Sequence, residues 1–147
     1  MKTTALLVAV LTAAYLKSVA NSQEDAAPSI AKPETVSKVQ ELQQQRIATL
    51  KDLVDSLNAE HRNGRRSFDE LIEANVHLLN AELETASADA ERIRLHEDIV
   101  KQFTSLEEFA KAAREAGRGF NSAVLKAKAR RLEAEISLER AKGRGAK

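Results

Sequence analysis

The stretch Asn63-Gly64-Arg65-Arg66-Ser67-Phe68-Asp69-Glu70 (NGRRSFDE) decides how this chain folds. An Asn-Gly pair favours a left-handed C-terminal cap, and such a cap ends a helix. Ser67 followed three residues later by Glu70 is a capping box, which starts a helix. The sequence therefore predicts one helix that stops at Gly64 and a second helix that begins at Ser67.

A related phrase recurs 53 residues further along, where Gly117 is again followed by an arginine. Spacing of apolar residues alone would match some positions of two helices, but it would not readily match a Gly-Arg pair and an Ala-Glu pair in the same register. We therefore predict two helix–break–helix repeats, at about 47–86 and 100–139. The shared positions are Gly64, Ala74, Leu79, Ala81 and Glu82, matched by Gly117, Ala127, Leu132, Ala134 and Glu135. The copies differ at the cap, because Phe120 stands where Ser67 is, so Asn121 or Ser122 is expected to cap the last helix.

Apolar residues recur between the breaks at alternating three- and four-residue steps, which is the pattern of a coiled-coil face. A further break is expected around Thr85 to Asp89, with Ser87 as its cap. The predicted buried stripes are Ile47, Leu50, Val54 and Leu57; Phe68, Ile72, Val76, Leu79, Leu83 and Ala86; Ile99, Phe103, Leu106, Ala110 and Ala113; and Leu125, Ala129, Leu132 and Ile136.

The composition indicates an all-α protein with narrow apolar stripes, since aromatic residues make up 3% and charged residues 31% of the chain. Good helix formers dominate, and there is no Cys, which excludes disulfides and thiol catalysis. We expect a long antiparallel coiled-coil hairpin, in which residues 36–86 lie beside residues 88–142. A compact four-helix bundle that folds back at every glycine is the alternative.

The first 20 residues are typical of a secretory signal. Lys2 precedes an apolar run, ALLVAVLTAAYL at 5–16, and Ser18-Val19-Ala20 offers a cleavage site after Ala20. An uncleaved anchor or an ordinary helix is the alternative, because Lys17 interrupts the segment. Residues 21–34 contain both prolines and are expected to form a flexible linker. The helical domain is predicted over 35–142, with a disordered tail at 143–147. We thus expect an exported protein.

Charge is distributed unevenly along the chain. Residues 21–110 carry a net charge of −8, and residues 111–147 carry a net charge of +7. The basic cluster at Lys126, Lys128, Arg130 and Arg131 is interpreted as pairing with the acidic first part of the chain. Contact with anionic lipid or an acidic partner is the alternative. Nucleic acid is not expected, since no aromatic residues interleave for base stacking.

No catalytic, cofactor-binding or metal-binding site is predicted. His61, His77 and His96 are 16 and 19 residues apart, which does not place them on one helical face. A metal site assembled across helices, with Glu60 or Asp98, is the less favoured alternative. Paired acids such as Glu70 and Glu73 can do acid–base work only when burial shifts their pKa, and on an amphipathic helix without a large core they are expected to be solvated.

The repeat phrase resembles that of the outer-membrane efflux family, the TolC-like channels, over roughly residues 47–140. In that family a glycine breaks a long helix, a Ser or Thr follows, and the next helix has an apolar pair, Ala, Leu and Ala-Glu. Here Leu71-Ile72 and Val124-Leu125 are the apolar pairs. The family's channels are longer and place strands between helical segments, so the resemblance implies only their helical, periplasmic part. It also favours helices stacked end to end at the glycines.

The resemblance implies a non-enzymatic coiled-coil scaffold that acts in transport or envelope assembly, in the periplasm or associated with the outer membrane. Its expected partners are further copies of itself or partner helices, bound through the apolar faces, and possible envelope transport proteins. Contact with a membrane is expected to be peripheral at most. A periplasmic holdase chaperone of the Skp type is the alternative, and an enzyme is the third option.

Overall fold

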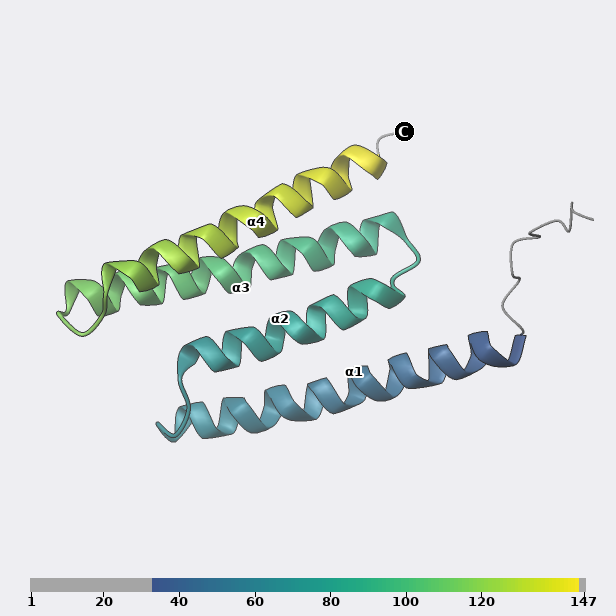
Figure 1. Cartoon of the computed structure of the whole chain (residues 1–147), viewed down its shortest axis with the longest axis horizontal. Coiled ribbons are helices and arrows are strands. Elements are labelled where there is room, and N and C mark those ends of the chain that lie inside the picture. The colour runs from purple at the N-terminus through teal and green to yellow at the C-terminus, as the bar shows by residue number, and fades with distance from the viewer. Residues whose placement is uncertain (1–32, 146–147) are drawn as a thin grey trace, which may run out of the picture. The chain divides into compact units, whose positions relative to one another are not determined.

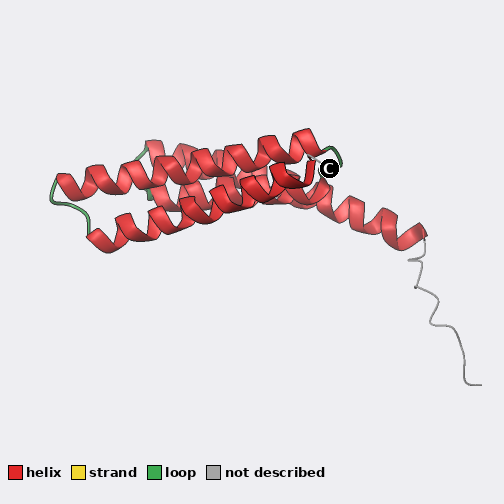
Figure 2. Ribbon diagram, turned by 90° about the horizontal axis from the view of Figure 1, so that it is seen from above, coloured by secondary structure: helices red, strands yellow, loops and turns green. Residues whose placement is uncertain are grey.

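The structure is a computed structural model that describes residues 33–145, and its helices from Val36 onward belong to one unit of the chain. The expectation of an all-α fold is confirmed, since these residues form helices and contain no strand. The chain reverses its direction at each of the three connections (Figure 1), and short loops join the helices (Figure 2). The helices are α1 (Pro33–Arg62), α2 (Phe68–Thr85), α3 (Asp89–Glu115) and α4 (Asn121–Gly145).

The two glycine breaks are built by the same hydrogen bonds, displaced by 53 residues. Gly64 and Gly117 have φ of +68° and +70°, the left-handed conformation that glycine adopts without a steric penalty. Each glycine N–H donates to the carbonyl three residues back, His61 or Arg114, at 2.8 and 2.9 Å. The N–H of the following arginine donates five residues back, to Glu60 or Ala113, at 2.9 Å in both copies. This is the Schellman pattern, so both helices end in the same way.

The restarts after the two glycines differ. Ser67 is the N-cap of α2, and its hydroxyl accepts a hydrogen bond from the Glu70 N–H at 3.3 Å. In the second copy α4 begins at Asn121, so the cap position falls on Phe120, whose side chain is 81% exposed. The expectation that Asn121 or Ser122 caps α4 is therefore wrong. The Asn121 Oδ1 instead accepts from Arg114 Nη1 at 3.0 Å.

The connection between α2 and α3 also differs in detail from the expectation. The break falls where it was predicted, between Thr85 and Asp89. Ser87 does not cap α3, however, because the N-cap residue is Ala88 and no side chain accepts a hydrogen bond there. Negative charge at Asp89 and Glu91 in the first turn favours this helix start through the helix dipole.

The core lies where α2, α3 and α4 meet. Its buried members come from all three helices, and Phe68, Val76 and Phe103 pack against them. Small side chains on α4 allow this helix to approach α3 closely. The central residues are Ile72 on α2, Leu106 and Ala110 on α3, and Val124 and Ala127 on α4.

Helix α1 packs more loosely than the other three. Within the described part of the chain, no Cα atom of α1 lies within 8 Å of a Cα atom in another helix. Its predicted stripe, from Ile47 to Leu57, is half-buried. Two exposed ion pairs connect it to α2, Arg46 to Glu84 at 2.7 Å and Lys51 to Glu82 at 3.4 Å. These pairs show that α1 and α2 run antiparallel.

The end-to-end stacking of helices at the glycines is wrong, and the long hairpin of residues 36–86 and 88–142 is not confirmed. The ion pairs between α1 and α2 require the chain to fold back at Gly64. At Gly117 it also folds back, because Arg131 on α4 pairs with Glu107 on α3.

Helix α4 continues to Gly145, so residues 143–145, which were predicted to belong to a disordered tail, are helical. The signal peptide and residues 21–32 of the predicted linker lie outside the described residues. The linker was expected to extend to residue 34, which is wrong, because α1 already begins at Pro33.

Candidate functional site

The interface between α3 and α4 is held by a buried carboxylate. Glu107 on α3 accepts a hydrogen bond from Arg131 Nε on α4 at 2.7 Å, and Lys111 Nζ lies 2.5 Å away. Arg131 also contacts Glu135, one turn further along α4. The hydrogen bonds from Arg131 and Lys111 lower the pKa of Glu107 to about 2, and they outweigh the opposing effect of burial. Glu107 is therefore ionised at neutral pH, and it fixes the register of α4 on α3.

A second arginine ties α4 to α2. The Arg130 guanidinium lies 3.3 Å from Asp69 and 2.6 Å from Glu73, and it stands over the Phe103 ring at 6.0 Å from the centroid. For Arg130 and Arg131 the interpretation as pairing within the chain is confirmed. The pairing of Asp69 and Glu73 with one arginine was not recognised in the sequence, because 57 residues separate Glu73 from Arg130.

The buried face of α4 is not the face that the sequence predicted. The helix buries Val124, Ala127, Ala134 and Leu138. All four residues that were expected to be packed are exposed, namely Leu125, Ala129, Leu132 and Ile136. The reason is that α4 meets α3 and α2 on one side only, and Arg130 and Arg131 hold that side inward. We call the exposed residues Leu125, Leu132 and Ile136 the α4 stripe.

Helix α1 also exposes large apolar residues. Four of them are well exposed: Val36, Val39, Leu42 and Leu53. Val36 and Val39 continue the line of the half-buried stripe, from Ile47 to Leu57, toward the start of the helix, whereas Leu42 and Leu53 lie beside that line. We call Leu42 and Leu53 the α1 edge. Both ends of the helical array thus present apolar side chains that no other described residue covers.

The repeat signature residues occupy partly matching environments. The alanines of both copies, Ala74 and Ala81 in α2 and Ala127 and Ala134 in α4, are all buried. Leu79 is half-buried, whereas its counterpart Leu132 is exposed. The two glutamates differ as well, because Glu82 pairs with Lys51 on α1 and Glu135 pairs with Arg131 on its own helix. The two copies therefore share their turns and small core residues but not their outer contacts.

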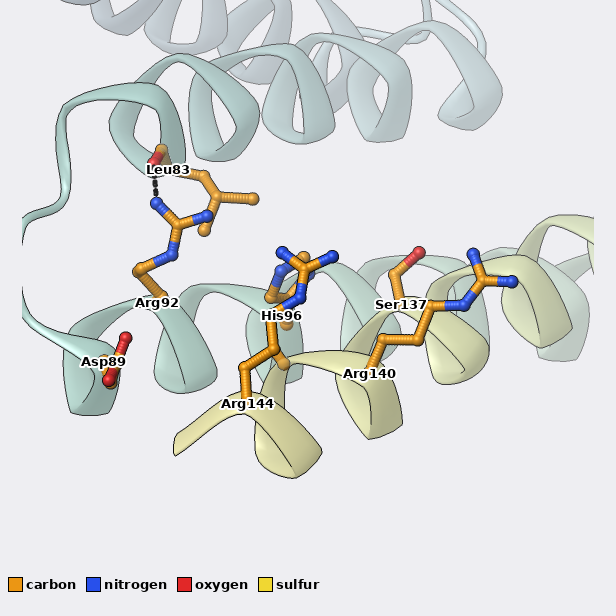
Figure 3. Close-up of a pocket in the computed structure, with 8 residues that line it drawn as sticks. Leu83, Asp89, Arg92, His96, Ser137, Arg140 and Arg144 are labelled. Atoms are coloured by element: carbon orange, nitrogen blue, oxygen red, sulfur yellow. Dashed lines mark hydrogen bonds between the residues drawn. The ribbon is translucent and has the colours of Figure 1, made fainter. Parts of the chain in front are cut away.

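A cavity of about 280 Å³ lies where α2 ends, α3 begins and α4 ends, and three arginines line it. Arg92 reaches toward the end of α2, and Arg144 rises from α4 toward His96 (Figure 3). Burial, followed by the charges of Arg92 and Arg144, lowers the pKa of His96. Asp89 also lines the cavity, so one carboxylate partly offsets the guanidinium charge. Guanidinium groups gathered in this way suit a bound anion or the free backbone carbonyls at the C-terminal end of α2. Arg92 already donates to the carbonyls of Leu83 and Ala86, at 3.5 and 3.4 Å.

The three histidines lie in separate places. His61 is in the turn after α1, where its Nδ1 is 3.0 Å from the Arg66 carbonyl and its ring is 5.6 Å from the Phe68 ring. His77 is exposed on α2, and His96 lines the arginine cavity. Among residues 33–145, no three His, Asp or Glu side chains gather in a way that would hold a metal ion.

Comparison with known proteins found no match among protein-family models, curated proteins or solved structures. None of the helices in the described segment has the length and apolar character needed to cross a membrane. The site must accordingly be interpreted from its own geometry.

Proposed function

We propose that the chain is a non-enzymatic, exported scaffold of the cell envelope that associates with further copies of itself through the α4 stripe. The observation that carries this proposal is the exposure of Leu125, Leu132 and Ile136 in one line along α4. Contiguous exposed apolar side chains at helical spacing are typical of a surface that binds another helix. No residue in the described part of the chain covers them.

The charge distribution favours a second copy as the partner. The segment that contains α4 has a net charge of +7, whereas residues 21–110 have a net charge of −8. Lys126 and Lys128 lie on α4 near the stripe, and no ion pair within the described residues involves either of them. Opposite charges on two parts of the same chain attract when two copies meet, and they steer the encounter.

The repeat phrase supports a place in transport or envelope assembly, because it resembles the helical part of TolC-like channels. In this proposal the helices pair as antiparallel coiled coils, α1 with α2 and α3 with α4, and the scaffold extends by adding chains. The proposed location is the periplasm or the outer-membrane surface, with at most peripheral contact with the membrane.

Sedimentation velocity of the full chain over a range of concentrations tests the proposal. We expect the average mass to rise with concentration, and we expect Leu125→Glu/Leu132→Glu to remain monomeric with unchanged helix content. Phe120→Ser is the matched control, because it removes an exposed apolar residue that is outside the stripe. All three proteins carry the same N-terminal segment, so their differences report on α4. A monomeric wild type, or a double variant that associates as strongly as wild type, would contradict the proposal.

The Skp-type holdase is the second candidate, and the exposed apolar residues next to basic side chains on α4 favour it. Suppression of aggregation of an unfolded outer-membrane porin distinguishes the two functions. A holdase suppresses aggregation of the porin whether or not the wild type self-associates. It loses this activity when the α4 stripe is replaced, as in Leu125→Glu/Leu132→Glu. A scaffold self-associates and leaves the porin to aggregate.

A further inference from the structure

Equivalent apolar side chains in the two copies of the repeat differ in whether a neighbouring helix covers them. Ile72 on α2 is 3% exposed, whereas its counterpart on α4, Leu125, is 58% exposed. Helix α2 has a neighbour on each side, since α1 precedes it and α3 follows it. Among the described residues, α4 packs against α3 and α2 and has no helix on its other side. The α4 stripe is therefore the face on which the first helix of a next repeat would lie.

The opposite end of the array shows the complementary difference. Leu106 and Leu95 on α3 are 6% and 1% exposed, whereas their counterparts on α1, Leu53 and Leu42, are 44% and 51% exposed. Helix α3 is covered by the preceding α2 as well as by α4. No helix among the described residues covers α1 on the side away from α2, so the α1 edge is exposed within this part of the chain.

Together, these differences describe two halves of one interface. We infer that the α4 stripe of one copy binds the α1 edge of a second copy, in the way that α2 binds α3 within the chain. This inference rests on the proposed self-association and adds the partner surface and the register. Because the two surfaces differ, the contact is head-to-tail, and it generates rings or open filaments instead of a closed two-fold dimer.

The junction between α2 and α3 supplies the register. Ile72 and Leu106 belong to one core cluster, and the antiparallel course of the helices then brings Leu83 toward Leu95. Arg92 lies at the same end of the junction and donates to the Leu83 carbonyl at 3.5 Å. Adding 53 to a position on α2 gives its counterpart on α4, and subtracting 53 from a position on α3 gives its counterpart on α1. These counterparts are the contacts expected between copies. Leu125 of one copy comes opposite Leu53 of the next, and Ile136 comes opposite Leu42.

Charges fit this register. Lys126 follows Leu125 and comes opposite Asp52, which is exposed beside Leu53 on α1. Lys126 and Ser122 stand where Glu73 and Asp69 are in the first copy, so α4 does not repeat the acidic pair with which α2 binds Arg130. A lysine opposite an aspartate across a helix pair favours this partner over a like-charged one.

One position of the expected contact differs in residue type from the junction between α2 and α3. Arg46 on α1 stands where Ile99 is buried on α3, and it comes opposite Leu132 of the neighbouring copy. Its long methylene stem can cover Leu132 while the guanidinium stays in water, where it already pairs with Glu84. The contact between copies is thus expected to be weaker than the internal junction, and reversible.

Mixing two blocked variants tests the head-to-tail contact. Leu125→Glu/Leu132→Glu blocks α4, and Leu42→Glu/Leu53→Glu blocks α1. We expect each variant alone to be monomeric and a mixture to form 1:1 pairs and nothing larger, because one open surface of each kind remains. If α4 bound α4, the α1-blocked variant would associate alone and mixing would add nothing, which would overturn this inference and leave the proposed scaffold standing. A monomeric wild type would remove both.

Disulfide formation tests the register directly, since the chain has no cysteine of its own. We expect Leu125→Cys mixed with Leu53→Cys to form a covalent dimer on mild oxidation. Leu125→Cys mixed with Leu42→Cys is the control, because 11 residues along a helix displace the thiols by about 16 Å, beyond the reach of a disulfide. Equal yields from the two mixtures, or a higher yield from the control, would contradict the register.

Discussion

Glu107 and Arg131 form a buried ion pair that joins α3 to α4, with Arg131 Nε 2.7 Å from Glu107 Oε2. The carboxylate is almost fully covered, and Lys111 supplies a second cation at the edge of the interface. Removing one member of a buried pair leaves an uncompensated charge in the interior. The resulting loss of folding stability is larger than the net stability that the intact pair contributes. This relationship makes the stability of the fold dependent on pH.

Glu107 is expected to make the protein sensitive to acid. Its pKa is about 2 in the folded chain and 4.5 in its ordinary environment, so folding favours the ionised form. The stability from this pair is complete above pH 4.5 and is lost as the pH falls toward 2. Urea unfolding between pH 7 and pH 2 measures the loss as a falling midpoint.

The substitution Glu107→Gln is expected to lower the urea midpoint at pH 7 and to flatten its fall in acid. Glu108→Gln is the matched control, because Glu108 is the next residue on the same helix and is exposed. An unchanged acid limb in Glu107→Gln would show that other carboxylates determine the acid response.

The glycines at the two breaks are expected to resist replacement. Gly64→Ala and Gly117→Ala each place a Cβ in the left-handed region, at φ of +68° and +70°, and should destabilise the chain by about 1–2 kcal/mol. The penalty comes from the backbone, because no neighbouring atom lies within 4 Å of the position that either new Cβ would take. Chemical denaturation monitored by circular dichroism measures it.

Gly143→Ala serves as the control for these substitutions and should have the opposite sign. Gly143 lies inside α4 with open space around it, so alanine should stabilise the helix by up to about 1 kcal/mol. If all three substitutions shift the midpoint in the same direction, the left-handed conformation is not what Gly64 and Gly117 contribute.

The missing cap of α4 can be restored. Phe120→Ser places a hydroxyl at the position that Ser67 occupies before α2, and we expect it to stabilise the chain by about 1 kcal/mol. Little packing is lost, because Phe120 is almost fully exposed. Thermal unfolding gives the change. Ser67→Ala should lower stability by a similar amount, whereas Ser87→Ala, which removes no cap, should leave it unchanged.

His96 is expected to titrate below its ordinary pKa of 6.5, because burial and the charges of Arg92 and Arg144 oppose protonation. Its pKa is lowered on folding, so the stability it contributes is present above pH 6.5 and is lost as the pH falls through the folded value. Two-dimensional NMR of the imidazole protons measures the titration. Arg144→Gln should raise the pKa of His96, and Arg94→Gln, on the exposed side of α3, should leave it in place.

Local signals in the sequence were sufficient for the four helices and for the two glycine breaks. Gly64, Gly117 and Ser67 act through their own backbone and side-chain geometry, which does not depend on the rest of the fold. The predicted stripes of α2 and α3 face the core for the same reason, since these helices have neighbours on both sides. Caps that depend on where a helix begins were less predictable, as Ser87 and Phe120 show.

The sequence by itself determined an all-helical chain, two related breaks and the separation of charge, because each of these is a property of neighbouring residues. Only the tertiary structure decided that the chain folds back at Gly64 and Gly117, and that α4 turns Arg130 and Arg131 inward and leaves Leu125, Leu132 and Ile136 exposed. Heptad spacing identifies an apolar face but not its partner. Which face is buried depends on which helices come side by side, and within residues 33–145 α4 has neighbours on one side only.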